Sequence, residues 1–188
     1  MNQQCLFSQE INITGLTHIS SYISSAYEEK LLKLIDTQKW NLDLKRRTQH
    51  YGYKYDYTAR SVDASYYLGE MPYWVDELCN KLLGDAIFIE RPDQVIINEY
   101  MPGQGIASHI DCVPCFAGTI CSLSLESGCV MDLTNDNIKK FIYLEPRSLL
   151  VLQCDARYKW KHGIAARKSD NRVKRQRRVS LTFRKVIL

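Results

Sequence analysis

The chain has 188 residues, of which 45% are hydrophobic and 24% charged, which is typical of one soluble globular domain. No apolar run approaches the about 18 residues needed to span a bilayer. The N-terminus lacks the basic and apolar stretches of a secretory signal, so we expect an intracellular, cytoplasmic protein without a membrane partner. The net charge of +4 is only mildly basic and by itself is weak evidence for nucleic acid.

The seven cysteines are an odd number, and an intracellular protein keeps its thiols reduced, so we expect free thiols rather than disulfides. Cys112 and Cys115 form the only close pair. A zinc site needs about four ligands, and no second pair stands at matching spacing. Buried thiols are the favoured interpretation, and a second metal at this pair is the alternative.

The first predicted elements are an arm and a helix. Residues 1–20 mix apolar and polar types and predict an N-terminal strand or arm. A helix is predicted over about residues 24–35, where apolar residues recur at helical spacing. Ser25 and Glu28 stand at the spacing of a capping box, which marks the start of this helix.

A second helix is predicted over residues 72–83, because Pro72 suits a first helical turn and Gly84 can follow the last one. After Arg91 the character changes to short β-rich segments separated by turn residues. Helices followed by many short strands predict an α+β protein with a sandwich or jelly-roll core, and no linker or repeat divides it. The predicted strands cover residues 94–100, 119–125, 129–133, 141–144, 148–152 and 179–187.

Three side chains have the chemistry of an iron site. His109 and Asp111 stand two residues apart, so in a strand they point the same way, and His162 lies downstream where a returning strand can bring it beside them. Two histidines and one carboxylate are the protein ligands of a facial iron(II) site with open positions. The alternatives are a surface loop for the pair and a hydrogen-bonded structural histidine. The other histidines, His18 and His50, precede the β-rich half and fit no ligand spacing.

The last predicted strand has the pattern of an acid-binding wall. Arg178, Ser180, Thr182 and Arg184 fall on one face of it, and two arginines are well suited to carboxylate binding. A half-buried strand with a solvated polar face would show the same alternation. A second wall is expected from Asn98 and Tyr100, which share a face of the strand over residues 94–100. The Pro102-Gly-Gln-Gly105 segment predicts a tight, closely approaching turn before His109.

Together, these segments resemble the AlkB family of 2-oxoglutarate- and iron(II)-dependent dioxygenases, which adopt a double-stranded β-helix. The resemblance covers about residues 40–187, and several ordered motifs carry it. They are Pro92-Asp-Gln-Val-Ile-Ile-Asn98-Glu-Tyr100-Met-Pro-Gly-Gln-Gly105, His109-Ile-Asp111, Ser122-Leu-Ser-Leu125, Arg147-Ser-Leu-Leu-Val151, Arg157-Tyr-Lys-Trp-Lys-His162-Gly163-Ile164 and Arg178-Val-Ser-Leu-Thr-Phe-Arg184.

The resemblance implies an oxidoreductase that uses Fe(II), 2-oxoglutarate and O2. In this family 2-oxoglutarate is decarboxylated to succinate while a C–H bond is hydroxylated, which releases formaldehyde from an N-methyl group. The implied domain fills residues 1–188, with an N-terminal extension and lid over about 1–90 and the β-helix over about 91–188. The implied iron ligands are His109, Asp111 and His162. The resemblance also implies that Tyr100 and Arg178 bind the distal carboxylate of 2-oxoglutarate. Its metal-chelating end is then bound by Asn98 and Arg184, and Ser180, between the two arginines, also contacts 2-oxoglutarate.

In this family the segment before the β-helix forms a nucleotide-recognition lid. Here that segment repeats tyrosine at every second position and carries basic side chains, which can stack on a base and meet phosphate. A strand with one tyrosine-rich packed face fits the same pattern equally well. The candidate substrate residues are Arg47, His50, Tyr51, Tyr53 and Tyr55.

One departure bears on the substrate. Repair members that act on cationic methylated bases carry an acidic residue two positions after the metal aspartate, whereas Val113 stands there. The motifs are similar in sequence to those of the family branch that hydroxylates wobble-uridine side chains in tRNA. We therefore expect a monomeric enzyme that oxidises alkylated or modified bases in RNA or DNA, by demethylation in DNA repair or by tRNA modification. The alternatives are the same chemistry on a protein or small molecule, and a non-catalytic RNA-binding β-sandwich.

Overall fold

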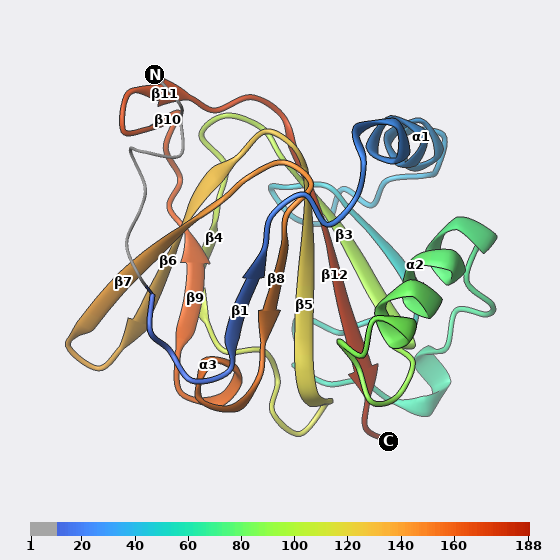
Figure 1. Ribbon diagram of the computed structural model, residues 1–188. Coiled ribbons are helices and arrows are strands. Elements are labelled where there is room, and N and C mark those ends of the chain that lie inside the picture. Colours follow the sequence, from blue (N-terminus) through green and yellow to red (C-terminus); the bar gives the residue numbers. More distant parts are fainter. Residues whose placement is uncertain (1–10) are drawn as a thin grey trace.

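The computed structural model describes residues 11–188, so the first half of the predicted N-terminal arm lies outside the described residues. Two antiparallel sheets face each other, and two helices pack on the outer side of the larger one (Figure 1). The expected α+β protein with a double-stranded β-helix core is confirmed. Among the described residues, no helix is long and apolar enough to cross a membrane.

The strands form a large sheet, a small sheet and a hairpin. The large sheet has the order β1 (Leu16–Ile19), β8 (Leu149–Leu152), β5 (Phe116–Glu126), β12 (Arg178–Val186), β3 (Gln94–Tyr100) and β2 (Thr48–Gly52). The small sheet has the order β4 (Ile106–His109), β9 (Lys161–Ile164), β6 (Cys129–Asn135) and β7 (Ile138–Leu144). The hairpin consists of β10 (Ser169–Asp170) and β11 (Val173–Lys174).

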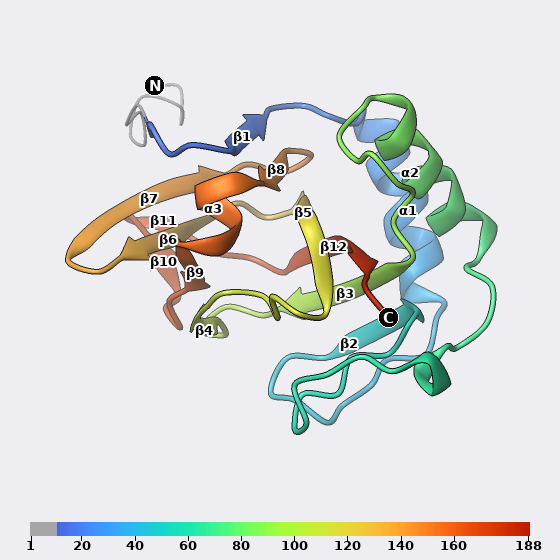
Figure 2. The ribbon, with the colours of Figure 1, turned by 90° about the horizontal axis from the view of Figure 1, so that it is seen from below.

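The alternation of β12 separates the two sides of the large sheet. Val179, Leu181 and Phe183 are fully buried in the core beneath the helices α1 (Ser25–Asp36) and α2 (Tyr73–Gly84). Figure 2 shows these helices on one side of the large sheet and the small sheet on the other. The polar residues of β12 therefore face the space between the sheets, as the period of two predicts.

Val186 keeps the alternation of β12. Its apolar side chain would group it with Val179, Leu181 and Phe183, but it stands two residues after Arg184 and therefore lies on the same face as Arg184. Val186 packs in the core between the two sheets, so placing it on the side of Phe183 is wrong. The register shift between Arg184 and Val186 lies on β5, whose paired residues there are Ile120 and Phe116.

The first helix is capped differently from the prediction. Ser24, rather than Ser25, is the N-cap, and its hydroxyl accepts from the Tyr27 backbone N–H at 3.2 Å. Glu28 does not close a capping box. Its carboxylate accepts from the Glu126 backbone N–H and from Arg147, each at 2.8 Å, and so ties α1 to the large sheet.

The large sheet begins earlier in the chain than the expected division near residue 90. β1 and β2 both precede that point, and β2 pairs with β3 over five residues. Short elements without a clear sequence signal were also not predicted, namely η2 (Ala64–Tyr66), α3 (Cys154–Tyr158) and the β10–β11 hairpin. The large sheet therefore draws on both ends of the chain.

Candidate metal centre and co-substrate pocket

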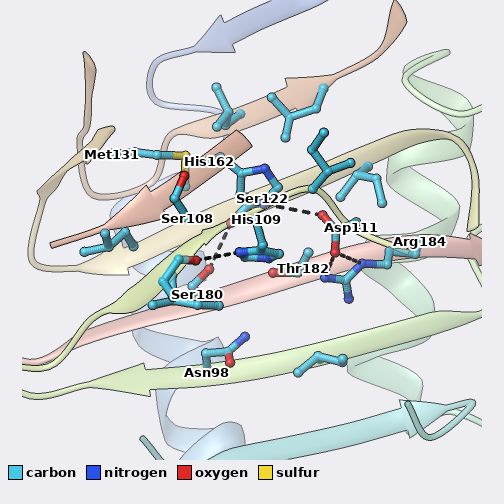
Figure 3. A pocket seen from close by; sticks show the side chains of 18 of the residues that line it. Asn98, Ser108, His109, Asp111, Ser122, Met131, His162, Ser180, Thr182 and Arg184 are labelled. Atoms are coloured by element: carbon cyan, nitrogen blue, oxygen red, sulfur yellow. Dashed lines mark hydrogen bonds and ion pairs between the residues drawn. The ribbon is translucent and has the colours of Figure 1, made fainter. Parts of the chain in front are cut away.

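Two histidines face each other across neighbouring strands of the small sheet. β4 pairs with β9 so that His109 stands opposite His162, and their ring centroids are 4.5 Å apart. Asp111 follows two residues after the end of β4, so the loop rather than an extended strand turns its carboxylate toward the rings. One ligand atom from each of the three residues lies within 4.8 Å of the others (Figure 3).

The close approach of β4 and β9 depends on glycine. A Cβ on Gly163 would lie 2.9 Å from the Ser108 backbone, and a Cβ on Gly105 would lie 2.1 Å from the Ile164 carbonyl oxygen. Any side chain at either position would push the two strands apart. The predicted close turn before His109 is thereby confirmed.

One oxygen of the Asp111 carboxylate accepts hydrogen bonds, and the other accepts none. Its Oδ1 accepts from Arg184 Nη2 at 2.6 Å and from Arg184 Nε at 3.0 Å. Its Oδ2 is buried without a hydrogen bond and lies 3.4 Å from His162 Nε2. A buried carboxylate oxygen left unpaired is costly unless a cation binds it.

His109 is oriented from its far side. Its Nδ1 lies 2.8 Å from the Ala107 carbonyl oxygen, so Nδ1 carries the hydrogen and donates to that oxygen. Nε2 is then left with a free lone pair, which is the arrangement found in histidines that bind metals. This carbonyl is the orienting partner that the sequence did not identify.

Charge and burial keep Asp111 and His162 in their metal-binding forms. Burial acts to raise the pKa of Asp111, but the charge of Arg184 and then those of the histidines outweigh it and hold this pKa well below its usual range. Burial lowers the pKa of His162 to about 4, and Asp111 only partly opposes that shift. An ionised carboxylate and a neutral imidazole are the forms that bind a divalent cation.

A cavity of about 630 Å³ lies between the two sheets and contains the three side chains. The polar face of β12 lines it, as do Asn98 and Tyr100 of β3, which the sequence placed on a second wall. The Ser180 hydroxyl lies 2.9 Å from that of Ser122 on β5. The residues of both predicted walls therefore line one cavity.

Arg178 is a side chain in this cavity with unused hydrogen-bond donors. It is 3% exposed, and its Nη2 donates to the Ser124 hydroxyl at 2.8 Å. Its guanidinium lies over the Tyr100 ring at 5.5 Å. Nε and Nη1 are buried without a partner. Free N–H groups on a buried guanidinium match the geometry of a carboxylate, so the residues present fit one end of a small dicarboxylate.

Arg184 forms hydrogen bonds with two side chains, Asp111 and Gln94. Besides the two hydrogen bonds to Asp111, its Nη1 donates to Gln94 Oε1 at 3.0 Å. Asn98 in turn accepts at Oδ1 from Arg46 Nε at 2.8 Å. Arg184 therefore fixes the orientation of the Asp111 carboxylate.

The candidate substrate residues separate into two groups. Tyr55 lines the cavity and packs edge-on against Tyr57, which also lines it, with ring centroids 5.2 Å apart. His50 packs on Tyr57 at 6.0 Å but does not line the cavity. Tyr51 packs on Trp74 beneath the helices.

The other two candidates also lie outside the cavity lining. Arg47 forms an ion pair with Glu99, and its guanidinium lies over the Trp40 ring at 4.5 Å. Tyr53 packs on Tyr67, with ring centroids 5.2 Å apart. The every-second-residue pattern failed here because β2 ends at Gly52, after which side chains no longer alternate.

Three basic side chains that the sequence analysis did not select line the cavity, namely Arg46, Arg60 and Lys161. None of them forms an ion pair within the part of the chain that the structure describes, where Asp111 is the only acidic residue of the lining. Arg46 differs from its neighbour Arg47 only in which way the loop before β2 turns it. No local sequence signal distinguishes the two.

The expectation of free thiols is wrong for one pair. The structure joins Cys112 to Cys115 as a disulfide, with their Cα atoms 5.3 Å apart. The tight turn after Asp111 brings two residues separated by three positions within reach of each other. The other described cysteines, Cys79, Cys121 and Cys129 in the interior and Cys154 on the surface, are free thiols.

The chain matches the model of the 2OG-Fe(II) oxygenase superfamily over residues 17–184. It is 37% identical to an uncharacterized protein of Acanthamoeba polyphaga mimivirus, with 100% of this chain and 92% of that protein covered. It is also 37% identical to the alkylated DNA repair protein ALKBH8 homolog of Arabidopsis thaliana, where the match covers 96% of this chain but only 61% of that longer protein.

Among solved structures, that of OsALKBH1 is similar with a TM-score of 0.72 at 15% identity, covering 94% of this chain and 99% of that one. This likeness supports the fold alone. The site geometry, the family model and the ALKBH8-like relative agree with one another. The chain belongs to the 2OG-Fe(II) oxygenase superfamily and, within it, to the AlkB-like dioxygenases.

Proposed function

We propose that His109, Asp111 and His162 hold iron(II) and that the protein oxidises modified bases in nucleic acid. The observation that carries this proposal is the buried Asp111 Oδ2, which has no hydrogen bond and lies close to the nitrogens of two imidazoles. Two histidines and a carboxylate on one side leave the opposite side of an ion open for other ligands. Bound iron would supply the oxidation of a C–H bond with 2-oxoglutarate and O2.

Arg178 and Tyr100 are proposed to bind the distal carboxylate of 2-oxoglutarate. The free Nε and Nη1 of Arg178 support this assignment, because a carboxylate would satisfy them. Asn98 and Ser180 line the same cavity and are proposed to contact the rest of this co-substrate. Arg184 is proposed to act on the metal end through Asp111, whose carboxylate it orients.

The cavity lining supports a nucleic-acid substrate. Tyr55 and Tyr57 present aromatic rings that can stack on a base, and Arg46, Arg60 and Lys161 supply positive charge that no ion pair in the described chain neutralises. Stacking combined with cationic side chains is how proteins hold single-stranded or extruded bases. The name of the Arabidopsis relative, an alkylated DNA repair protein, agrees with this substrate class.

The same charges favour a neutral or anionic modified base over a cationic one. The only carboxylate in the lining of the described cavity is Asp111, and Arg184 already neutralises it. A cationic methylated base would therefore meet positive charge without an acidic partner. We propose a neutral or acidic substituent on a base of RNA or DNA, acted on by a monomeric protein inside the cell.

The test measures succinate formed from 2-oxoglutarate with iron(II) and oligonucleotides that carry one modified base. We expect the modified strand to raise succinate production above the unmodified strand, and His109→Ala to abolish it. Lys159→Ala is the matched surface control, since Lys159 is exposed and pairs with Asp155. Equal turnover by wild type and His109→Ala would refute the iron assignment, and no response to any oligonucleotide would refute the substrate class.

A further inference from the structure

The loop after β4 carries a cysteine pair that the proposed oxidation of a base does not use. Cys112 follows the metal-site residue Asp111 directly in the chain and lines the same cavity. Cys115 is buried, and the two sulfurs are joined. A Cys-x-x-Cys pair is a spacing typical of redox-active thiols.

The pair fits both a reduced and an oxidised state. Both sulfurs lie close to the Arg60 carbonyl oxygen, Cys112 Sγ at 3.4 Å and Cys115 Sγ at 3.5 Å. Thiols are weak hydrogen-bond donors, so a reduced pair can donate to this oxygen. The Cα separation of 5.3 Å is within the usual range for disulfides. Oxidation therefore requires no rearrangement of the backbone.

Arg157 holds the pair in place relative to the metal site. Its guanidinium is 2% exposed and donates to the carbonyl oxygens of Asp111 at 3.0 Å and of Cys112 and Phe116 at 3.2 Å. One buried cation thus fixes the backbone on both sides of the cysteines. The thiol of Cys112 is consequently held one residue away from the carboxylate that would bind iron.

We propose that Cys112 and Cys115 are an internal electron donor that reacts when 2-oxoglutarate and O2 are consumed without a nucleic-acid substrate. This inference rests on the proposed dioxygenase function. The two S–H bonds break and one S–S bond forms, which provides two electrons and two protons in place of the substrate C–H bond. One 2-oxoglutarate, one O2 and the two thiols give one succinate, one CO2, one water and one disulfide. An external thiol restores the pair by exchange.

The inference is tested with fully reduced protein, iron(II), 2-oxoglutarate and O2, without nucleic acid and without an added reductant. Succinate is quantified, and the Cys112–Cys115 disulfide is measured by alkylation of the remaining thiols and peptide mass spectrometry. We expect about one succinate for each disulfide formed. Cys115→Ser should remove this burst of succinate, and Cys112→Ser should do the same, so the test does not depend on one variant. Cys154→Ser, which removes an exposed single thiol, should leave the burst unchanged.

Three outcomes would overturn the inference alone. One is a disulfide that forms equally fast without 2-oxoglutarate or in His109→Ala, because that is simple air oxidation. Another is an undiminished burst in both Cys115→Ser and Cys112→Ser. The third is succinate formed without any disulfide, which leaves the dioxygenase function standing. Absence of 2-oxoglutarate-dependent succinate under all conditions overturns both the inference and the proposed function.

Discussion

The two oxygens of the Asp111 carboxylate lie in different surroundings, and this difference supports its proposed role as a metal ligand. Arg184 binds Oδ1 through two hydrogen bonds, whereas Oδ2 has none and faces the histidines. The same contrast applies to Arg178, in which one guanidinium nitrogen donates a hydrogen bond and the other two have no partner. Buried polar atoms without partners are rare in folded proteins, so these atoms mark where ligands are expected.

Replacing Arg178 tests the carboxylate site at the level of one residue. Arg178→Ala removes charge-assisted hydrogen bonds worth about 1.5–3 kcal/mol each, so we expect 2-oxoglutarate to bind at least about tenfold more weakly. Calorimetric titration of 2-oxoglutarate into the metal-loaded protein measures this change. Arg172→Ala, on the exposed hairpin, is the control. Unchanged 2-oxoglutarate affinity together with intact folding would argue against the assignment.

His50 is a single residue that makes the stability of the folded protein depend on pH. Burial, followed by the charges of Lys54 and Arg184, lowers its pKa to about 4 from 6.5. Between these values the unfolded chain binds more protons than the folded one, so stability is full above pH 6.5 and falls as the pH decreases toward 4. The loss is at most about 3 kcal/mol. His50→Gln should flatten this dependence in denaturant titrations, and an identical pH profile would contradict the prediction.

Among the elements of the fold, the strands β4 and β9 determine the geometry of the proposed metal site, because their close approach brings the two histidines together. β4 supplies His109 and β9 supplies His162, and Gly163 permits the contact between them because a Cβ there would meet the Ser108 backbone. The large sheet contributes a different part, since β12 and β3 carry the residues around Arg178. The two histidines and the residues proposed to bind a carboxylate thus come from opposite sheets.

Gly163→Ala tests the strand contact. We expect the added methyl group to displace β4 from β9, to destabilise the protein by about 1–3 kcal/mol, and to weaken metal binding because the two histidines separate. Thermal unfolding with and without iron(II) or Mn(II) measures both effects. Gly84→Ala is the matched control, since a Cβ at that position meets nothing within 4 Å. A metal-induced stabilisation equal to that of the wild type would show that the contact is not required.

For the molecule as a whole, a net charge of +4 is too small to indicate a nucleic-acid partner. The arrangement of the charge is more informative. Many basic side chains are used in internal ion pairs, such as Arg175 with Asp170 and Arg177 with Glu99. Arg60 and Lys161 at the cavity form none within the described part of the chain. Positive charge free of ion pairs therefore lies at the proposed substrate site.

The salt dependence of oligonucleotide binding measures whether these basic side chains contact phosphate. The affinity for a single-stranded oligonucleotide should fall as salt increases. Lys161→Ala and Arg60→Ala should each reduce the slope of log K against log salt by about 0.7 for each phosphate that the side chain neutralises in the wild type. Lys159→Ala is the control, because Lys159 lies two residues before Lys161 but outside the cavity lining. Slopes that stay the same in both variants would argue for a partner other than nucleic acid.

Local sequence patterns were enough to predict much of the fold and several of the residues that meet in the cavity. The alternation in β12 and the spacing of His109 and Asp111 are such patterns, and the alternation holds along β12 because a strand has a fixed period of two. The strand Gln94–Tyr100 was predicted with its observed bounds from the same kind of signal. No local pattern identifies His162, and the family resemblance strengthened its prediction as the third ligand.

The folded chain was needed to learn which basic and aromatic side chains reach the cavity. Arg46 lines it while Arg47 pairs with Glu99, and Tyr57 lines it while Tyr53 does not. These residues lie mostly in loops, where side-chain direction follows no period and depends on packing against distant segments. The joining of Cys112 to Cys115 likewise depends on how the chain turns after β4. In a regular strand the local sequence determines which way each side chain points, whereas in a loop the packing of the completed fold determines it.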